Sequence, residues 1–258
     1  MRSDWASLPD AVTARIAARV GGIIDVCPAP SGDHAEIAST VTGSAGKVFV
    51  KAASGEFGVR SLRYELSATE AIDCAPAVLW HVEDGGWLAV GVEHLDGPHP
   101  DLSPGSADLG VLAVALKGLQ TAPAPGGTWF TPEARLGFSQ PAMAGRSLIH
   151  TDLSPANLIK TAGGLRIVDW AWATRAAPWV ELTLLVQWLI GAGHTPDQAE
   201  EWLSQFPAWV SLDGAVLDEF ASKNAAKWSA KSRRTAAGWV HDLAAWTGEW
   251  AAHRRNGL

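Results

Sequence analysis

The feature of the sequence that most constrains this chain is the segment HTDLSPAN, from His150 to Asn157, followed by Asp169 in the segment LRIVDW. Short apolar runs lie on both sides of the first segment, and two adjacent glycines separate it from the second. Such runs are typical of short strands, and the polar residues between them are typical of a loop. The pattern therefore predicts an Asp and an Asn on one loop and a second Asp at the end of a following strand.

These three side chains have the chemistry that phosphoryl transfer needs. One carboxylate accepts or orients the proton of an attacking hydroxyl, while an amide oxygen and a second carboxylate bind Mg²⁺, which neutralises charge on the phosphates. Asp152, Asn157 and Asp169 suit those roles in that order. The alternative is that Asp152 and Asn157 are ordinary turn residues, because Asp, Asn, Ser and Pro favour turns. We expect His150 to brace the loop by hydrogen bonding and not to act as a base.

In this context HTDLSPAN followed by VDW resembles the catalytic and metal-binding segments of the aminoglycoside phosphotransferases, a family that shares the protein-kinase fold. The likeness runs from about residue 30 to the C-terminus and is strongest over residues 147–185. It implies an α+β, bilobal, protein-kinase-like fold, with an antiparallel sheet and one key helix in a small N-lobe and a larger, mainly helical C-lobe. Glu181 stands where the family usually has Asp, and we expect it to support the catalytic loop.

The order of elements along the chain agrees with two lobes. Helical and strand patterns alternate up to residue 95, a Pro- and Gly-rich stretch follows at 96–105, and helical patterns dominate afterwards. We therefore place an N-lobe at 1–97 and a C-lobe at 98–258. The individual predictions are a helix from Asp10 with a capping box to Ser7, hairpins over 35–52 and 78–95, a helix over 58–72, short strands around 147–170, and helices beyond Trp179, one of them capped by Thr195.

The N-terminal half contains a Lys and a Glu that we expect to pair. Glu65 lies on a largely apolar helix face, where a carboxylate without a partner is costly. Lys51, near the end of the preceding strand, is the natural partner. In the kinase fold such a lysine contacts the α- and β-phosphates of the nucleotide and pairs with a helix glutamate. The alternative is that Glu65 lies at the rim of the apolar stripe and faces water.

The resemblance also implies a nucleotide site. The segment from Val92 to Gly97 is similar to the family's hinge, which suggests the carbonyl of Glu93 and the amide of Leu95 as adenine contacts. An ordinary strand end would have the same sequence. Ser31 and Gly32 lie where the loop over the phosphates is expected, although the family's loop usually carries more small residues. The expected ligands are ATP, or GTP, with Mg²⁺.

Composition excludes several other classes of protein. A net charge of −7 argues against a nucleic-acid binder and favours a cationic substrate, for which Glu200 and Glu201 are candidate contacts. The apolar segment 178–193 is too short to span a bilayer. Two cysteines give no disulfide framework, and we expect both to be reduced core thiols. The fourteen tryptophans are expected to pack in the core, with one or two of them as a substrate platform for which the sequence indicates no choice.

From these observations we expect a cytoplasmic monomer or homodimer that phosphorylates a hydroxyl of a small molecule and binds neither nucleic acid nor membrane. The resemblance points to aminoglycosides or amino sugars, and hence to antibiotic resistance. Another biosynthetic alcohol, or a Ser or Thr of a peptide, remains an alternative acceptor, because fold does not determine substrate. A nucleotide-binding module without catalysis is the alternative from another class; such modules usually lack one of the four key residues, all of which are present here.

Overall fold

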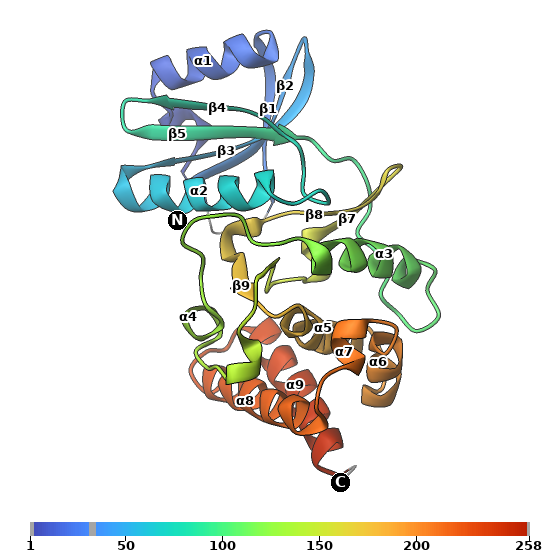
Figure 1. Ribbon diagram of the computed structural model, residues 1–258. Helices are drawn as coiled ribbons and strands as arrows, with labels where there is room; N and C mark the ends of the chain where they lie inside the picture. The colour runs from blue at the N-terminus through green and yellow to red at the C-terminus, as the bar shows by residue number, and fades with distance from the viewer. Residues whose placement is uncertain (1–2, 31–34, 257–258) are drawn as a thin grey trace. The chain divides into compact units, whose positions relative to one another are not determined.

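The computed structural model of the chain describes residues 3–30 and 35–256 (Figure 1). The chain divides into two compact units. The smaller unit comprises Met1–Gly97 together with Arg166–Ala171, and the larger comprises Pro98–Leu165 together with Trp172–Leu258.

The segment Arg166–Ala171 belongs to the smaller unit, whereas the sequence analysis placed all residues beyond 97 in the C-lobe. Two interactions account for this. The Arg166 guanidinium donates to the Glu93 carboxylate at 2.7 Å, and the backbone N–H of Ile167 donates to the carbonyl of Cys74 at 2.8 Å. An ion pair and a backbone hydrogen bond thus attach a short piece of the C-terminal half to the first unit.

A five-stranded antiparallel sheet forms the centre of the smaller unit, with the strands in the order β1-β2-β3-β5-β4. The hairpin between β2 and β3 turns within two residues, and Gly46 has a φ of 115°, which L side chains rarely adopt. The strands are β1 (Ile23–Pro28), β2 (Ile37–Gly43), β3 (Gly46–Ser54), β4 (Val78–Asp84) and β5 (Trp87–Glu93).

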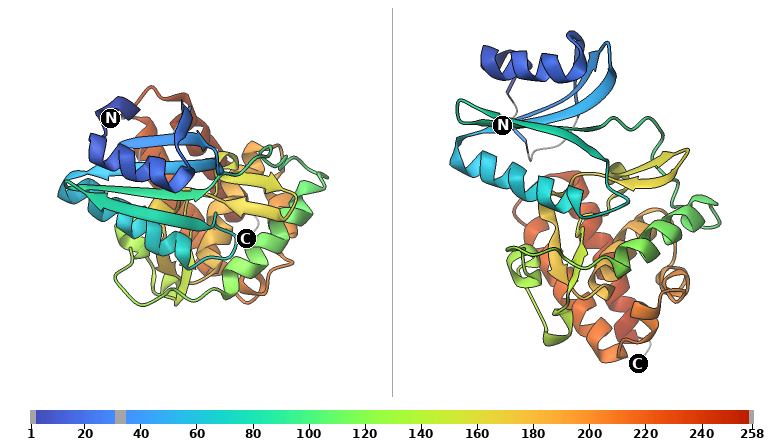
Figure 2. Two further views of the ribbon diagram at one scale, coloured as in Figure 1. Left: turned by 90° about the horizontal axis from the view of Figure 1, so that it is seen from above. Right: turned by 45° about the horizontal axis from the view of Figure 1, so that its top comes forward.

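Two helices cover opposite faces of this sheet (Figure 1; Figure 2, right). Helix α1 (Asp10–Val20) buries apolar side chains at a spacing of four residues, which places them on one face. They pack with one set of sheet residues, including Ala52 and Ala89. Helix α2 (Gly55–Glu70) packs against the adjacent, oppositely facing positions, such as Ala53. Alternation along the strands therefore gives the unit one apolar layer on each side of the sheet.

The predicted elements of this unit are present, with two corrections. The helix predicted over 58–72 begins at Gly55, directly after β3. The predicted capping box at Ser7 is wrong, since Pro9 is the N-cap of α1 and the Ser7 hydroxyl donates to the carbonyl of Asp4 at 2.6 Å. Ser7 is the last residue of a short 3-10 helix, Trp5–Ser7, and does not belong to the start of α1.

The larger unit is mainly helical, with short strands near its start. Strands β6 and β9 pair antiparallel, and β7 pairs with β8 in a second two-stranded sheet. Beyond position 97 the helices are α3 (Asp108–Thr121), α4 (Pro132–Leu136), α5 (Trp179–Gly191), α6 (Pro196–Leu203), α7 (Pro207–Val210), α8 (Gly214–Ser232) and α9 (Gly238–Asn256). The strands there are β6 (Ser147–Ile149), β7 (Leu158–Thr161), β8 (Gly164–Ile167) and β9 (Thr174–Ala176), and the 3-10 helices are Pro141–Met143, Pro155–Asn157 and Trp170–Trp172. The end of β8 and the start of the last 3-10 helix lie in Arg166–Ala171 and so belong to the smaller unit.

Helix α5 forms the core of the larger unit and is buried on nearly all sides. A helix that is apolar all round needs neighbours on every face, and α5 contacts α6, α7, α8 and α9. The capping box predicted at Thr195 is confirmed, with Pro196 as the first residue of α6. Among the described residues, no helix combines the length and apolar composition that a bilayer crossing requires.

Candidate functional site

The smaller unit places one lysine between two carboxylates. Lys51 lies in β3, Glu65 lies in α2, and Asp169 follows β8. The ammonium of Lys51 donates to Glu65 Oε1 in a short ion pair and to Asp169 Oδ1 at 2.8 Å. The predicted pairing of Lys51 with Glu65 is therefore present. The contact with Asp169, across 118 positions of sequence, was not predicted.

This cluster holds its charges in a buried environment. Burial lowers the pKa of Lys51, but the Glu65 and Asp169 carboxylates more than offset it, so the pKa is raised above its ordinary value. Lys51 is thus a permanent cation at physiological pH. A simple ion pair of one ammonium and one carboxylate is neutral. This cluster has a second carboxylate and so keeps a net negative charge, which favours binding of a divalent cation.

Asp169 has an unusual backbone conformation. Its φ is 67°, in the left-handed region that non-glycine residues seldom occupy. Such strain costs of order 1–3 kcal/mol and is concentrated at functional sites. Next to it, Trp170 is fully buried and its indole N–H donates to the carbonyl of Ile167 at 2.8 Å. The buried ring anchors the turn that carries Asp169.

In the larger unit, Glu181 anchors the loop that begins at His150. Its buried carboxylate accepts a short hydrogen bond from the N–H of His150 and bonds of 3.1 and 3.3 Å from the N–H of Thr151. The predicted support of the loop by Glu181 is confirmed. Burial raises the pKa of Glu181 to about 7, although both backbone donors oppose the rise.

Thr151 is the second described non-glycine residue with positive φ, at 66°. Beyond the bond to Glu181, its hydroxyl donates to the carbonyl of Trp172 at 3.0 Å and accepts from Arg135 Nε at 3.0 Å. The Arg135 guanidinium lies 4.5 Å from the centroid of the Trp172 ring. These contacts offset the strain at Thr151 and hold the residue immediately before Asp152 in one conformation.

The loop itself is braced from within. His150 is fully buried, and its Nδ1 accepts from the N–H of Asp152 at 3.2 Å, as the sequence analysis expected of a bracing residue. The side-chain amide of Asn157 donates to the carbonyl of Asp152 at 2.9 Å. This bond leaves the Asn157 Oδ1 as the acceptor atom of the side chain. Asp152 and Asn157 are thus held in one loop, each half-buried.

The donor set fits a hard cation. Asn157 supplies an amide oxygen and Asp169 a carboxylate, both of the kind that Mg²⁺ prefers. Within the described ranges, no cluster of three or more His, Cys, Asp or Glu side chains that could hold a metal ion is found. A metal bound through an amide and a carboxylate would not require one.

The remaining predicted residues lie as follows. Glu93 ends β5, its N–H donates to the carbonyl of Ala77 at 2.8 Å, and its side chain pairs with Arg166. Leu95 lies two residues beyond, in irregular backbone. Ser31 and Gly32 lie outside the described residues. Glu200 was a candidate contact for a cationic substrate, but its carboxylate is already occupied. It accepts from Arg254 at 2.8 Å and from the indole N–H of Trp250.

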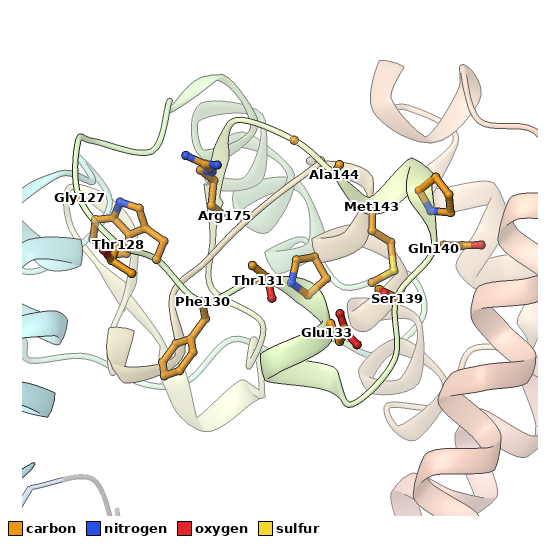
Figure 3. A pocket seen from close by; sticks show the side chains of 14 residues that line it. Gly127, Thr128, Phe130, Thr131, Glu133, Ser139, Gln140, Met143, Ala144 and Arg175 are labelled. Carbon is orange, nitrogen blue, oxygen red and sulfur yellow. The ribbon is translucent and has the colours of Figure 1, made fainter.

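Two pockets lie within the larger unit. One, of about 690 Å³, is surrounded by the loop 127–131, the start of α4, the segment 139–145 and Arg175; Figure 3 shows Phe130, Glu133 and Met143 around it. No predicted site residue lines it. The other, of about 450 Å³, lies between the segment 136–138 and α8. Lys227 lines this smaller pocket, and the Asp152 carboxylate acts to raise the Lys227 pKa, although burial and Arg135 lower it by more.

Sequence reasoning missed three residues of this site, namely Arg135, Thr151 and Trp172. Thr151 lies in the segment HTDLSPAN but was given no role, and the contacts that join it to Arg135 and Trp172 depend on the tertiary fold. Cys27 was also misjudged, because it is exposed although it is free as expected. A strand of six residues with an exposed face, β1, explains that position.

No protein-family model matches the sequence, and no curated protein matches it. Solved structures do match. A choline/ethanolamine kinase family protein from Mesorhizobium loti has 14% identity and a TM-score of 0.54, covering 95% of this chain and 94% of its own. A protein assigned as a fructosamine-3-kinase from Haemophilus somnus 129PT has 13% identity and a TM-score of 0.56 over 93% and 96%. The amicoumacin kinase hAmiN, in complex with AMP-PNP, Ca²⁺ and Ami, has 13% identity and a TM-score of 0.54 over 96% and 95%.

Identities this low establish the fold alone. The chain has the α+β, protein-kinase-like fold of these small-molecule kinases, with one unit built on an antiparallel sheet and a larger, mainly helical unit. The predicted α+β, protein-kinase-like fold is thereby confirmed.

Proposed function

We propose that this protein is a small-molecule kinase that transfers the γ-phosphoryl group of ATP to a substrate hydroxyl. The observation that carries the proposal is the Lys51 ammonium held between Glu65 and Asp169. Lys51 and Glu65 come from the consecutive elements β3 and α2, whereas Asp169 lies 118 positions beyond Lys51. An ion pair that serves structure alone requires one carboxylate. In a kinase one carboxylate positions the lysine and a second binds the metal beside the phosphates, so the presence of both carboxylates favours the kinase function.

On this proposal Lys51 contacts the α- and β-phosphates, and Glu65 holds Lys51 in position. The carbonyl of Glu93 and the amide of Leu95 contact the adenine, and Ser31 and Gly32 cover the phosphates. These assignments follow the family resemblance. The buried ion pair supports the first of them, because it keeps the lysine charged and in one rotamer.

Asp152 is the base of the proposed reaction. The acceptor oxygen forms a bond to the γ-phosphorus, the bond from that phosphorus to the bridging oxygen breaks, and the hydroxyl proton passes to the Asp152 carboxylate. Asn157 and Asp169 would hold Mg²⁺, which supplies positive charge to the phosphates when bound. Glu181, His150 and Thr151 fix the backbone at Asp152, and that support keeps its carboxylate in place during the reaction.

The names of similar structures support a small molecule as the acceptor. One of those structures holds AMP-PNP and Ca²⁺, which supports a nucleotide and a divalent cation as ligands. Aminoglycosides and amino sugars remain the substrate class that the family resemblance suggests.

The test is Asp152→Asn, which keeps the size of the side chain and removes the proton acceptor. Nucleotide affinity, measured by calorimetry with Mg-ATP, should stay nearly unchanged. Phosphoryl transfer to an accepted substrate should fall by at least about 10²-fold, the usual scale for a lost general base. Full activity in this variant would show that Asp152 is not the base.

The same experiment separates a kinase from a binding module. The wild-type protein should consume ATP in the presence of at least one member of a panel of aminoglycosides, amino sugars, choline, hydroxy acids and Ser- or Thr-containing peptides. Tight binding of Mg-ATP with no phosphorylation across that panel would favour the non-catalytic module.

A further inference from the structure

The 450 Å³ pocket in the larger unit is lined by one face of α8. Lys223, Lys227 and Lys231 follow one another in α8 at a spacing of four residues, and Arg234, in the turn after α8, also lines the pocket. Residues at this spacing share one side of a helix. The volume lies within the range of small-molecule sites. The pocket therefore presents several cations to a space large enough for a small ligand.

Most of these cations are not neutralised by carboxylates. Lys223 is, since it pairs with Glu219 at 2.6 Å and donates to the carbonyl of Ser139. In the ranges that the structure describes, Lys227, Lys231 and Arg234 form no such ion pair. The surroundings of Lys227 are costly for its charge: burial first, then Arg135 and Lys231, lower its pKa to about 8, and Asp152 offsets this only in part.

Aromatic rings hold two of these cations in place. Lys231 Nζ lies 4.8 Å from the centroid of the Trp228 ring and 4.6 Å from that of Trp239. The two rings meet edge to face at 6.0 Å. Arg135 is held by Trp172 in the same way. A cation–π contact positions a cation without cancelling its charge, so the cluster keeps a positive potential.

We propose that this pocket binds an anionic group of the acceptor, a carboxylate or a phosphate, so that the substrate is a negatively charged alcohol. The inference rests on the proposed function, because it places the acceptor hydroxyl at Asp152. Lys227 connects the two places, since its ammonium interacts with the Asp152 carboxylate and lines the pocket. An anion there would relieve the repulsion among Lys227, Lys231 and Arg135.

The proposal departs from the cationic substrate expected from the net charge of −7. Net charge is a sum over the whole surface, and exposed charges more than about 8–10 Å apart are largely screened at physiological ionic strength. The charged groups that interact with Asp152 decide which substrate is attracted. In the described chain those are Arg135 and Lys227, together with the buried Glu181, whose carboxylate is bonded to backbone.

The experiment uses a matched series on one carbon skeleton: glycerol, glycerate, glycerol 3-phosphate and 3-amino-1,2-propanediol. Binding of each to the intact protein is measured by calorimetry. Glycerate or glycerol 3-phosphate should bind more tightly than glycerol, and the amine should bind most weakly. Comparison of glycerate with glycerol 3-phosphate tells which anion the pocket takes. Equal binding of all four compounds, or preference for the amine, would overturn the proposal.

Variants then locate the binding. Lys227→Gln and Lys231→Gln should each weaken binding of the preferred anion by about ten- to a hundredfold, as expected for a lost charge-assisted hydrogen bond. Arg255→Gln, which removes an exposed positive charge elsewhere in the larger unit, should leave binding unchanged. Lys231 is exposed, so its variant should fold even if that of Lys227 does not. An unchanged affinity in Lys231→Gln would exclude this pocket.

Failure of this inference differs from failure of the proposed function. If ATP is consumed with neutral or cationic alcohols only, the kinase proposal stands and the anionic acceptor is refuted. If glycerate or glycerol 3-phosphate binds through Lys227 and Lys231 but ATP is never consumed with any alcohol, the pocket is an anion site and its role as acceptor site is refuted. ATP consumption that depends on an anionic alcohol and falls in both variants supports the whole inference.

Discussion

The variant Glu181→Gln tests how the loop that carries Asp152 is held in place. The Glu181 carboxylate is buried and accepts from the N–H groups of His150 and Thr151. In Glu181→Gln the side chain keeps its shape but offers one acceptor oxygen in place of two, and its amide group would face one of the backbone donors. We expect the loop to shift, and turnover to fall by about 10²-fold, the scale of a misplacement near 1 Å.

The contribution of Glu181 to the stability of the wild-type protein should respond to pH in the opposite way from that of a paired surface carboxylate. Burial raises the Glu181 pKa from its ordinary 4.5 to about 7, so between these pH values the folded chain binds more protons than the unfolded chain. Stability from this group is fully present below pH 4.5 and is lost as pH rises to 7. At about 1.4 kcal/mol for each pH unit, the loss is about 3 kcal/mol at most.

The assay is urea unfolding at several values between pH 5 and pH 7.5. Wild-type stability should decline over this window relative to Glu181→Gln, which has no proton to lose at this position. Near pH 7.5 the variant should be as stable as wild type or more so, since replacing a buried charge is often neutral or stabilising. Glu249→Gln, an exposed change of the same charge on α9, should keep the wild-type profile.

Parallel pH profiles for wild type and Glu181→Gln would refute the reasoning. That result would mean that the backbone donors outweigh burial, so that Glu181 is ionised throughout the window. A variant that is more stable than wild type near pH 7.5 yet nearly inactive would show that this carboxylate is kept for loop geometry and not for stability.

Two further predictions concern the smaller unit. Lys51→Ala and Glu65→Gln should each weaken ATP use, and a double-mutant cycle should give a coupling of about 0.5–3 kcal/mol because the two side chains form one ion pair; additive effects in ATPase or transfer assays would mean that they act independently. Asp169→Ala should abolish Mg²⁺-dependent turnover while circular dichroism shows a folded protein, since it removes a proposed metal ligand and one partner of Lys51; undiminished turnover would remove Asp169 from the metal site.

The sequence predicted those parts of the site in which the local sequence pattern around a residue indicates its role. Glu65 on an apolar helix face needs a partner, and Lys51 on the neighbouring strand is within reach once the helix packs on the sheet. Glu181 was expected to support the loop from its place in the resemblance. The capping box at Thr195 followed from the spacing of side chains within one turn.

The parts that were not predicted depend on tertiary packing. The bond from Lys51 to Asp169 joins positions 118 residues apart, and no local pattern indicates it. The left-handed backbone at Thr151 and Asp169 was missed because sequence favours Gly or Asn for that conformation. Strand β9 has three residues, too few to show alternation, and was missed for that reason. Such strained positions are where local rules are expected to fail, because surrounding contacts over-determine them.

The chain has a net negative charge, yet helix α8 of the larger unit gathers positive charges on one side. This basic helix was interpreted from sequence as a solvated face, which is what lysines at a spacing of four residues usually form. For Lys223 that interpretation holds, because Glu219 lies one turn earlier and balances it. Among the described residues Lys227 and Lys231 form no ion pair and lie over tryptophan rings, and Arg135 lowers the pKa of Lys227 by more than Asp152 raises it. A solvated face would gain stability from acidic partners, so cations held by aromatic rings beside Asp152 are better explained by a ligand that supplies the missing negative charge.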